Sequence, residues 1–247
     1  WPDSLQWIVT DKKSSSVSAP PTRSSVQRSE IAFLQFTSGS TSDPKGVMIT
    51  HGNLAHNLTI ITNELQASTS TVVVSWLPQY HDMGLIGSYL GVLYCGGTGY
   101  YMSPLSFLQR PMLWMEAVSK YKATHLQAPN FAFKLTARKY KDTKLDLSSV
   151  QHIINAAEPV DAESLQVFYN AFGKFGLKRV IFPTYGLAEH TVFVCSGGTQ
   201  ILHVNKHELE VNGRVVKVDT NGNASSTLVG CGYPSRQKVD VRIVDKE

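Results

Sequence analysis

Long apolar runs, paired cysteines and clustered charge are all scarce in this sequence of 247 residues. No apolar stretch reaches the roughly 18 residues that a membrane-spanning helix needs, and the start lacks the charged-then-apolar pattern of a signal peptide. The three cysteines, Cys95, Cys195 and Cys231, are odd in number and lack metal-ligand spacing. We therefore expect reduced thiols in a cytoplasmic protein. The net charge of +4 comes from scattered lysines and arginines, which indicates no nucleic-acid partner.

The composition is that of an ordinary globular protein, with 42% hydrophobic and 17% charged residues. This length can build one large domain or two small ones. Residues 1–30 contain a short candidate strand followed by a Ser/Pro-rich connection. Because the chain begins with Trp1 and not with methionine, we expect a fragment of a longer protein.

Apolar patterns of strand and helix alternate along residues 31–190. A helix is predicted after Thr50, because Leu54, Leu58, Ile61 and Leu65 recur at helical spacing. Further helices are predicted at residues 84–94, 111–121, 130–140 and 161–172. A buried strand is predicted at the start of residues 31–46, with others at residues 47–50, 71–76, 99–102, 123–127, 152–156 and 179–182. The alternation predicts an α/β fold of βαβ units on a largely parallel sheet, with ligands at the carboxyl ends of the strands.

The pattern changes at residue 191, where short β-like runs are separated by Gly- and Asn-rich turns. The runs cover residues 192–196, 201–205, 214–218, 227–231 and 239–244. Residues 191–247 are therefore predicted to form a smaller antiparallel β-rich subdomain.

A Ser/Thr/Gly-rich loop follows the apolar run in residues 31–46, IAFLQFTSGSTSDPKG. Backbone N–H groups around a glycine, surrounded by hydroxyl donors, suit a polyphosphate, and Lys45 adds a positive charge. The order of a Walker P-loop is absent, since Lys45 precedes its glycine, and a plain hydroxyl-rich hairpin loop is the alternative. The phosphate-binding residues predicted here are Thr37, Ser38, Gly39, Ser40 and Thr41.

Three later segments also place polar or small residues at predicted strand ends. In LPQYHDMGL, His81 could meet a ligand or be a solvated structural residue. In NAAEP, residues 155–159, small side chains would let a flat ring approach, although a plain strand-to-helix turn is the alternative. In TYGLAE, residues 184–189, Tyr185 offers an aromatic face, Thr184 a hydroxyl near phosphate, and Glu189 a ligand for Mg²⁺. Tyr185 and Glu189 could equally be a packing residue and a helix-dipole charge.

Together these segments resemble the adenylate-forming enzymes, the superfamily of acyl-CoA synthetases, nonribosomal peptide adenylation domains and luciferases. FTSGSTSDPKGVMITH is similar to their phosphate-binding signature, although most members have glycine where this chain has Ser42. With PQYHDMGL and YGLAE, this departure most resembles fatty acyl-AMP ligases and the related domains of disco-interacting proteins. The resemblance extends from residue 31 to residue 247.

The resemblance implies part of the large N-terminal domain of a ligase that joins a fatty acid to ATP, with Mg²⁺, in fatty acid metabolism and lipid biosynthesis. Lys45, His81 and Glu189 would be catalytic, His81 at the acyl end. Glu189 and Thr41 would hold the metal. The remaining ATP-binding residues would be Asn155, Ala156, Ala157, Glu158, Thr184, Tyr185, Gly186 and Leu187.

The resemblance also bears on the acyl acceptor. Residues 197–227 would match an insertion that disfavours coenzyme A, so the acyl group would pass to an acyl carrier protein or a polyketide synthase module. Relatives carry a catalytic lysine in a small C-terminal domain that this sequence lacks. An acyl-CoA ligase and a non-catalytic nucleotide- or lipid-sensing module therefore stay open as alternatives.

Overall fold

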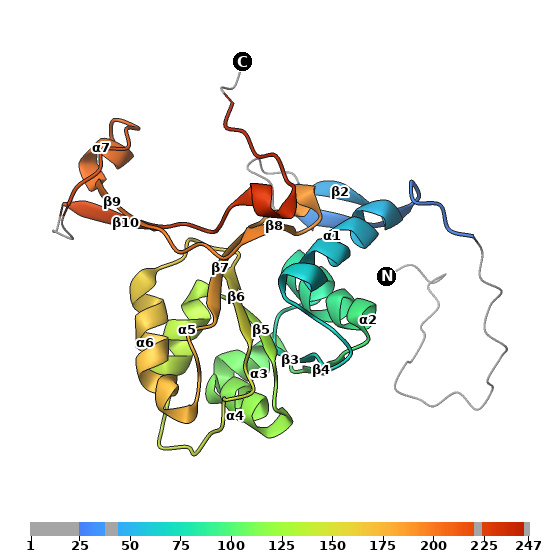
Figure 1. The fold of residues 1–247 in the computed structure, drawn as a ribbon, viewed down its shortest axis with the longest axis horizontal. Helices are drawn as coiled ribbons and strands as arrows, with labels where there is room; N and C mark the ends of the chain where they lie inside the picture. Colours follow the sequence, from blue (N-terminus) through green and yellow to red (C-terminus); the bar gives the residue numbers. More distant parts are fainter. Residues whose placement is uncertain (1–24, 38–43, 220–223, 245–247) are drawn as a thin grey trace, which may run out of the picture.

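A computed structural model describes residues 25–37, 44–219 and 224–244. Its centre is a six-stranded sheet in the order β4–β3–β5–β6–β7–β8 (Figure 1). Neighbouring strands run parallel except at the edge, where β8 is antiparallel to β7. This confirms the predicted α/β fold with a largely parallel sheet. The strands are β3 (Val72–Ser75), β4 (Thr98–Tyr101), β5 (His125–Pro129), β6 (His152–Ala156), β7 (Ile181–Gly186) and β8 (Phe193–Ser196).

The longer helices begin at side-chain caps that the sequence supplies. α1 (His51–Glu64) starts at Thr50, whose hydroxyl accepts the Asn53 N–H at 3.1 Å, and α6 (Ala162–Phe172) starts at Asp161. The predicted apolar face of α1 points inward, with Leu58 and Ile61 buried. The other helices are α2 (Gly91–Cys95), α3 (Pro104–Gln109), α4 (Met112–Tyr121), α5 (Asn130–Arg138), the π-helix η1 (Met83–Leu90) and the 3₁₀ turns η2 (Gly173–Phe175), η3 (Ala188–His190) and η4 (Pro234–Gln237).

An aromatic cluster fills the core between the sheet and helices α4, α5 and α6. Trp114, Phe133 and Phe168 are fully buried, with ring centroids 6.1 Å apart for Trp114 and Phe133 and 5.1 Å for Phe133 and Phe168. The helices α5 and α6 lie side by side (Figure 1). Burial of such large rings is the main stabilising contribution to this part of the fold.

The strand at the start of residues 31–46 was predicted to be buried, and this prediction is wrong. Among the described residues, β1 (Ile31–Thr37) pairs only with β2 (Lys45–Thr50), in an antiparallel hairpin. Its apolar side chains are largely exposed, since Phe36 is 62% accessible and Leu34 is 49% accessible; Met48, opposite Leu34 in β2, is 65% accessible. A two-stranded hairpin can bury one face at most, and here that face carries Gln35 and Ile49.

The region after residue 191 is partly antiparallel, as predicted, but its strands differ. β8 joins the central sheet, while β9 (Ile201–Asn205) and β10 (Ser225–Val229) form a separate pair next to α7 (Lys206–Glu210) (Figure 1). The division at residue 190 stays a prediction.

Two predicted strands of this region are wrong. Residues 214–218 contribute a single bridge, from Lys217 to Val204, and residues 239–244 pair with no other described residue. An alternating pattern creates a strand only where a neighbour completes the ladder of backbone hydrogen bonds. For residues 214–218 the ladder is limited to two bonds with β9, from the Asn205 N–H to the Val216 carbonyl and from the Val218 N–H to the His203 carbonyl, and residues 239–244 have no ladder with any described residue. Ile243 is accordingly 98% exposed.

Across the described ranges, no helix combines the length and the apolar character that crossing a membrane requires.

Candidate functional site

A cavity of about 590 Å³ opens where the carboxyl ends of the parallel strands meet the hairpin β1–β2 and the loop before η1. Each of the four predicted segments contributes described residues to its wall. The structure therefore brings together segments that are up to about 150 residues apart in the chain. The predicted site residues that line the cavity are Thr37, His81, Ala156, Ala157, Thr184, Tyr185, Gly186 and Leu187.

The ends of β6 and β7 form the rigid side of this cavity. Ala156 ends β6 beside Pro129, and Ala157 follows with a positive φ of 71°, a conformation that costs a non-glycine residue on the order of 1 kcal/mol. Gly186 ends β7 so close to the Val192 carbonyl oxygen that a side chain there would overlap it. Glycine is thus required at position 186 for the backbone to follow this path.

His81 lines the cavity from the loop that follows β3. Its Nδ1 lies 2.7 Å from a carboxylate oxygen of Asp82, and Asp82 also accepts the Met83 N–H at 2.6 Å at the start of η1. The hydrogen bond to Asp82 raises the pKa of His81, and burial opposes this only in part. The loop is tied to the hairpin because the Gln35 amide donates to the Tyr80 carbonyl at 3.1 Å. His81 is therefore a positioned, readily protonated group at the cavity wall.

Tyr185 and Thr184 lie next to each other on β7 but differ in availability. The Tyr185 ring is half exposed and lines the cavity, as a purine-stacking group would. The Thr184 hydroxyl donates to the Phe182 carbonyl at 3.0 Å and shares a hydrogen bond with Ser196 at 2.9 Å. Its hydroxyl is thus already used within the sheet, and its role near phosphate stays a prediction.

Asn155 and Glu158 do not line the cavity. Asn155 is fully buried and its amide donates to Asn130 Oδ1 at 3.0 Å. The Glu158 carboxylate accepts the Phe131 N–H at the start of α5, where a negative charge also suits the helix dipole. These contacts indicate that both residues position the strand ends, while their contact with adenine stays a prediction.

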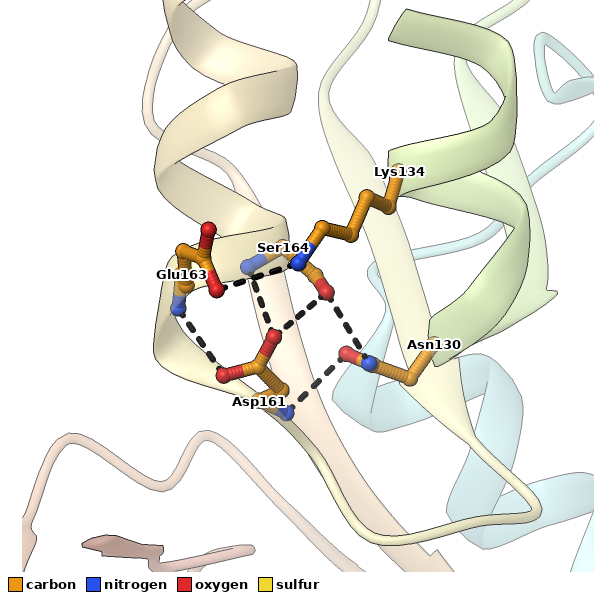
Figure 2. Close-up of polar contacts among 5 residues, drawn as sticks. All are labelled: Asn130, Lys134, Asp161, Glu163 and Ser164. Atoms are coloured by element: carbon orange, nitrogen blue, oxygen red, sulfur yellow. Dashed lines mark hydrogen bonds and ion pairs between the residues drawn. The ribbon is translucent and has the colours of Figure 1, made fainter. Parts of the chain in front are cut away.

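Asn130 connects this strand edge to the first turn of α6 (Figure 2). Its amide donates to Ser164 Oγ at 3.3 Å and its carbonyl oxygen accepts the Asp161 N–H at 3.1 Å. Asp161 in turn accepts the Glu163 and Ser164 N–H groups, at 3.1 and 3.0 Å, and Lys134 pairs with Glu163 at 3.0 Å. Burial alone would raise the pKa of Asp161, but its hydrogen bonds from Ser164 and Glu163 lower it overall. The network holds α5, α6 and β6 in one arrangement.

Glu189 is exposed and faces a smaller cavity of about 150 Å³, lined also by residues of β2 and α1. Its carboxylate has no hydrogen-bond or ion-pair partner among the described residues. A carboxylate without a protein partner is available to bind Mg²⁺, which proteins commonly hold with one or two carboxylates and the substrate's phosphates. Within the described part of the chain, no cluster of three or more His, Cys, Asp or Glu could hold a metal by itself.

The phosphate loop can be located only at its two ends. Lys45 is exposed and stands opposite Thr37 in the hairpin register. The predicted residues Ser38, Gly39, Ser40 and Thr41 lie outside the described residues, as does Ser42.

The deeper wall of the large cavity was not predicted. It is formed by Ile61 of α1, Leu65 at the C-terminal cap of α1, Gly87 of η1, Gln127 of β5 and Ile154 of β6. Strand alternation could have identified Ile154 and Gln127. Ile154 lies two residues before Ala156, on the same face of the sheet, and Gln127 is its partner in the register of β5 and β6. The contribution of α1 and η1 depends on packing between distant elements.

Comparison with known proteins identifies the family. Residues 2–247 match the AMP-binding enzyme family. The chain is 40% identical to the medium-chain-fatty-acid–[acyl-carrier-protein] ligase TtuA of Teredinibacter turnerae, over 84% of this chain and 33% of TtuA. It is 37% identical to the corresponding ligase JamA of Moorena producens, over 93% of this chain and 40% of JamA.

A solved structure shares both fold and sequence. The fatty acyl-adenylate ligase of L. pneumophila, crystallised with acyl adenylate and pyrophosphate, superposes with a TM-score of 0.78 and is 41% identical, over 85% of this chain and 38% of that one. The chain thus spans between a third and two fifths of the length of these relatives. By sequence and by fold, this chain belongs to the AMP-binding enzyme family.

Proposed function

We propose that the chain forms the nucleotide- and acyl-binding part of a fatty acyl-AMP ligase, which joins a fatty acid to ATP as an acyl adenylate and releases pyrophosphate. The observation that carries this proposal is the shared cavity, because described residues of all four segments line it. The relative from L. pneumophila supports it, since that protein was crystallised with both products.

The reaction needs positioning more than covalent help from the protein. The carboxylate oxygen attacks the α-phosphorus of ATP, the bond from the α-phosphorus to the bridging oxygen breaks, and pyrophosphate leaves. Holding the two reactants in line and countering phosphate charge lowers the barrier. We assign the purine to the half-exposed face of Tyr185 and the small residues Ala156 and Ala157, and the pyrophosphate to Thr37, Lys45 and the loop between them.

Two charged groups complete the assignment. Glu189 would hold Mg²⁺, which supplies charge neutralisation at the phosphates when bound. His81 lies beside Asp82 with a raised pKa, so its protonated form persists to higher pH and can donate a hydrogen bond to the carboxylate or the phosphoryl oxygen. Of these groups, Thr37 and His81 line the large cavity, whereas Glu189 lines the smaller one and Lys45 stands opposite Thr37 in the hairpin.

The proposal extends to the acceptor of the acyl group, by analogy with named relatives, and to the cellular compartment, from the state of the cysteines. TtuA and JamA are named as acyl-carrier-protein ligases, so we assign an acyl carrier protein as the acceptor. We place the protein in the cytoplasm, because all three cysteines are free thiols.

ATP–pyrophosphate exchange with a fatty acid tests the proposal. We expect Glu189→Ala to lower the exchange rate by a factor of about 100 or more, the size of effect seen when one charge-stabilising group is removed. Glu210→Ala is the matched control, since Glu210 is an exposed glutamate of α7 that lines neither cavity. The exchange is measured in the full-length protein, because this chain spans only between a third and two fifths of the length of its relatives. Unchanged exchange in Glu189→Ala would remove the assignment of Glu189, and no exchange in the unmodified full-length protein would overturn the function.

A further inference from the structure

Gln127 is a polar side chain in an apolar wall. It lies in the middle of β5, is only 6% exposed, and lines the large cavity beside Ile61, Leu65 and Ile154. No described residue forms a hydrogen bond with its amide. Its amide atoms are not enclosed by protein, so they meet the open cavity, where water can pair with them in the free protein. A ligand that displaces this water must replace its hydrogen bonds or lose affinity.

The position of Gln127 along the strand places it inside the cavity and not at its mouth. Gln127 pairs with Ile154 in the sheet register, and Pro129 pairs with Ala156 at the strand ends. Two residues of strand correspond to roughly 6–7 Å, and alternation keeps both pairs on the same face. A ligand that extends inward from the strand ends along this face therefore passes the Gln127 amide.

Gly87 of η1 makes room for the end of this side chain. A β-carbon at Gly87 would lie 2.6 Å from Gln127 Oε1 and 3.3 Å from Nε2. Because Gly87 also lines the cavity, the amide group meets the cavity wall where β5 faces η1. The amide is thus held at a defined depth, with a donor and an acceptor both present.

We propose that Gln127 is a specificity-determining residue, and that the preferred acyl group carries a hydroxyl or oxo substituent that hydrogen-bonds to its amide. The proposal rests on the proposed function, because it assigns this part of the cavity to the acyl chain. A plain alkyl chain would cover the amide and leave it unpaired, whereas an oxygen substituent at the same depth would pair with it. Sites that hydrogen-bond a substrate hydroxyl reject analogues lacking it far more strongly than apolar pockets reject an added methylene.

Non-hydrolysable acyl-sulfamoyl adenosines test the proposal by calorimetric titration of the full-length protein. The panel comprises the decanoyl analogue and its hydroxy and oxo derivatives, with the substituent moved one carbon at a time. We expect at least one derivative to bind about tenfold or more tightly than the decanoyl analogue, the value of one buried hydrogen bond. The two kinds of derivative show whether the amide prefers to donate or to accept.

Gln127→Leu provides the decisive variant. We expect it to abolish the preference for the oxygenated analogue and to bind the decanoyl analogue at least as tightly as the unmodified protein does. Ile154→Val is the matched control: it trims the apolar wall at the paired position but keeps the amide, so the preference should persist. Circular dichroism checks that each variant is folded.

Two results would count against the proposal and can be told apart. If every derivative binds no better than the decanoyl analogue and Gln127→Leu leaves that ratio unchanged, the inference is wrong while the proposed function stands. If the folded protein binds none of the analogues, the proposed function is wrong and this inference with it.

Discussion

The parallel strands β5, β6 and β7 and the hairpin β1–β2 border the same cavity but are held in place differently. The parallel strands lie inside a six-stranded sheet whose side chains, such as Leu126 and Ile153, are fully buried. The hairpin has two strands, and its side chains Phe36 and Met48 are exposed.

This difference matters for the site. The strand ends are positioned by a dense core and by the Asn130 network, so the small residues at the cavity wall have little freedom. The hairpin is attached by few side-chain contacts, among them the bond from Gln35 to the Tyr80 carbonyl. We infer that the purine side of the cavity is rigid and that the phosphate side is the more adjustable one.

The largest expected effect comes from the core behind the sheet. Trp114→Ala removes a fully buried ring whose Nε1 donates to the Val74 carbonyl at 3.3 Å. We expect the free energy of unfolding to fall by about 3–5 kcal/mol, as for other buried aromatic residues. Phe36→Ala in the hairpin is the matched control and should cost less than about 1 kcal/mol, because its ring is already exposed. Urea denaturation measures both, and equal losses would contradict the contrast between the two regions.

A smaller effect is expected at the end of β7. Gly186→Ala places a methyl group against the Val192 carbonyl, so the backbone must shift at the cavity wall. We expect a loss of stability of about 1–3 kcal/mol and weaker binding of an acyl-adenylate analogue. At Gly173, by comparison, a β-carbon would meet no atom within 4 Å, and φ is −57°.

Gly173→Ala is therefore the control for Gly186→Ala. It should be neutral or stabilising by up to about 1 kcal/mol, because it reduces the freedom of the unfolded chain. If both glycine variants behave alike in thermal denaturation and in binding, the wall at β7 is less rigid than the packing indicates.

The smallest expected effect is a dependence on pH that distinguishes the two regions. His125 and His152 stack in neighbouring strands with centroids 5.1 Å apart. Burial lowers the pKa of both, and the proximity of His125 lowers that of His152 further, while the Leu65 carbonyl and Glu64 oppose these shifts. A pKa below the unfolded value of 6.5 means that the unfolded chain takes up protons first as the pH falls.

The contribution of this histidine pair to the free energy of unfolding should accordingly be fully present above pH 6.5 and should decline as the pH drops below that value. Hydrogen exchange should then accelerate in β5 and β6, whereas the described residues of the hairpin strands, which contain no histidine, should change less. Acid-independent stability between neutral pH and the mildly acidic range would contradict this reading of the histidine pair.

Much of the fold could be predicted because its patterns are local. The period of apolar residues marked β6 at residues 152–156 with its observed bounds, and Thr50 and Asp161 marked the starts of α1 and α6. The predicted strand at residues 239–244 failed because alternation describes a side-chain pattern and not the partner strand that would complete it. β1 was wrongly expected to be buried because an apolar run does not show which sheet it joins.

The amino-acid sequence by itself determined the order of strands and helices, the caps of the main helices and the four segments that resemble a nucleotide site. Only the tertiary structure decided which side chains share a cavity, that Asn155 and Glu158 stand behind its wall, and that Gln127 enters it without a partner. The physical reason is that periodicity and capping act over a few residues, whereas cavities arise from packing between distant ones. Asn57 illustrates this, since its amide satisfies both backbone groups of Phe193, 136 residues away.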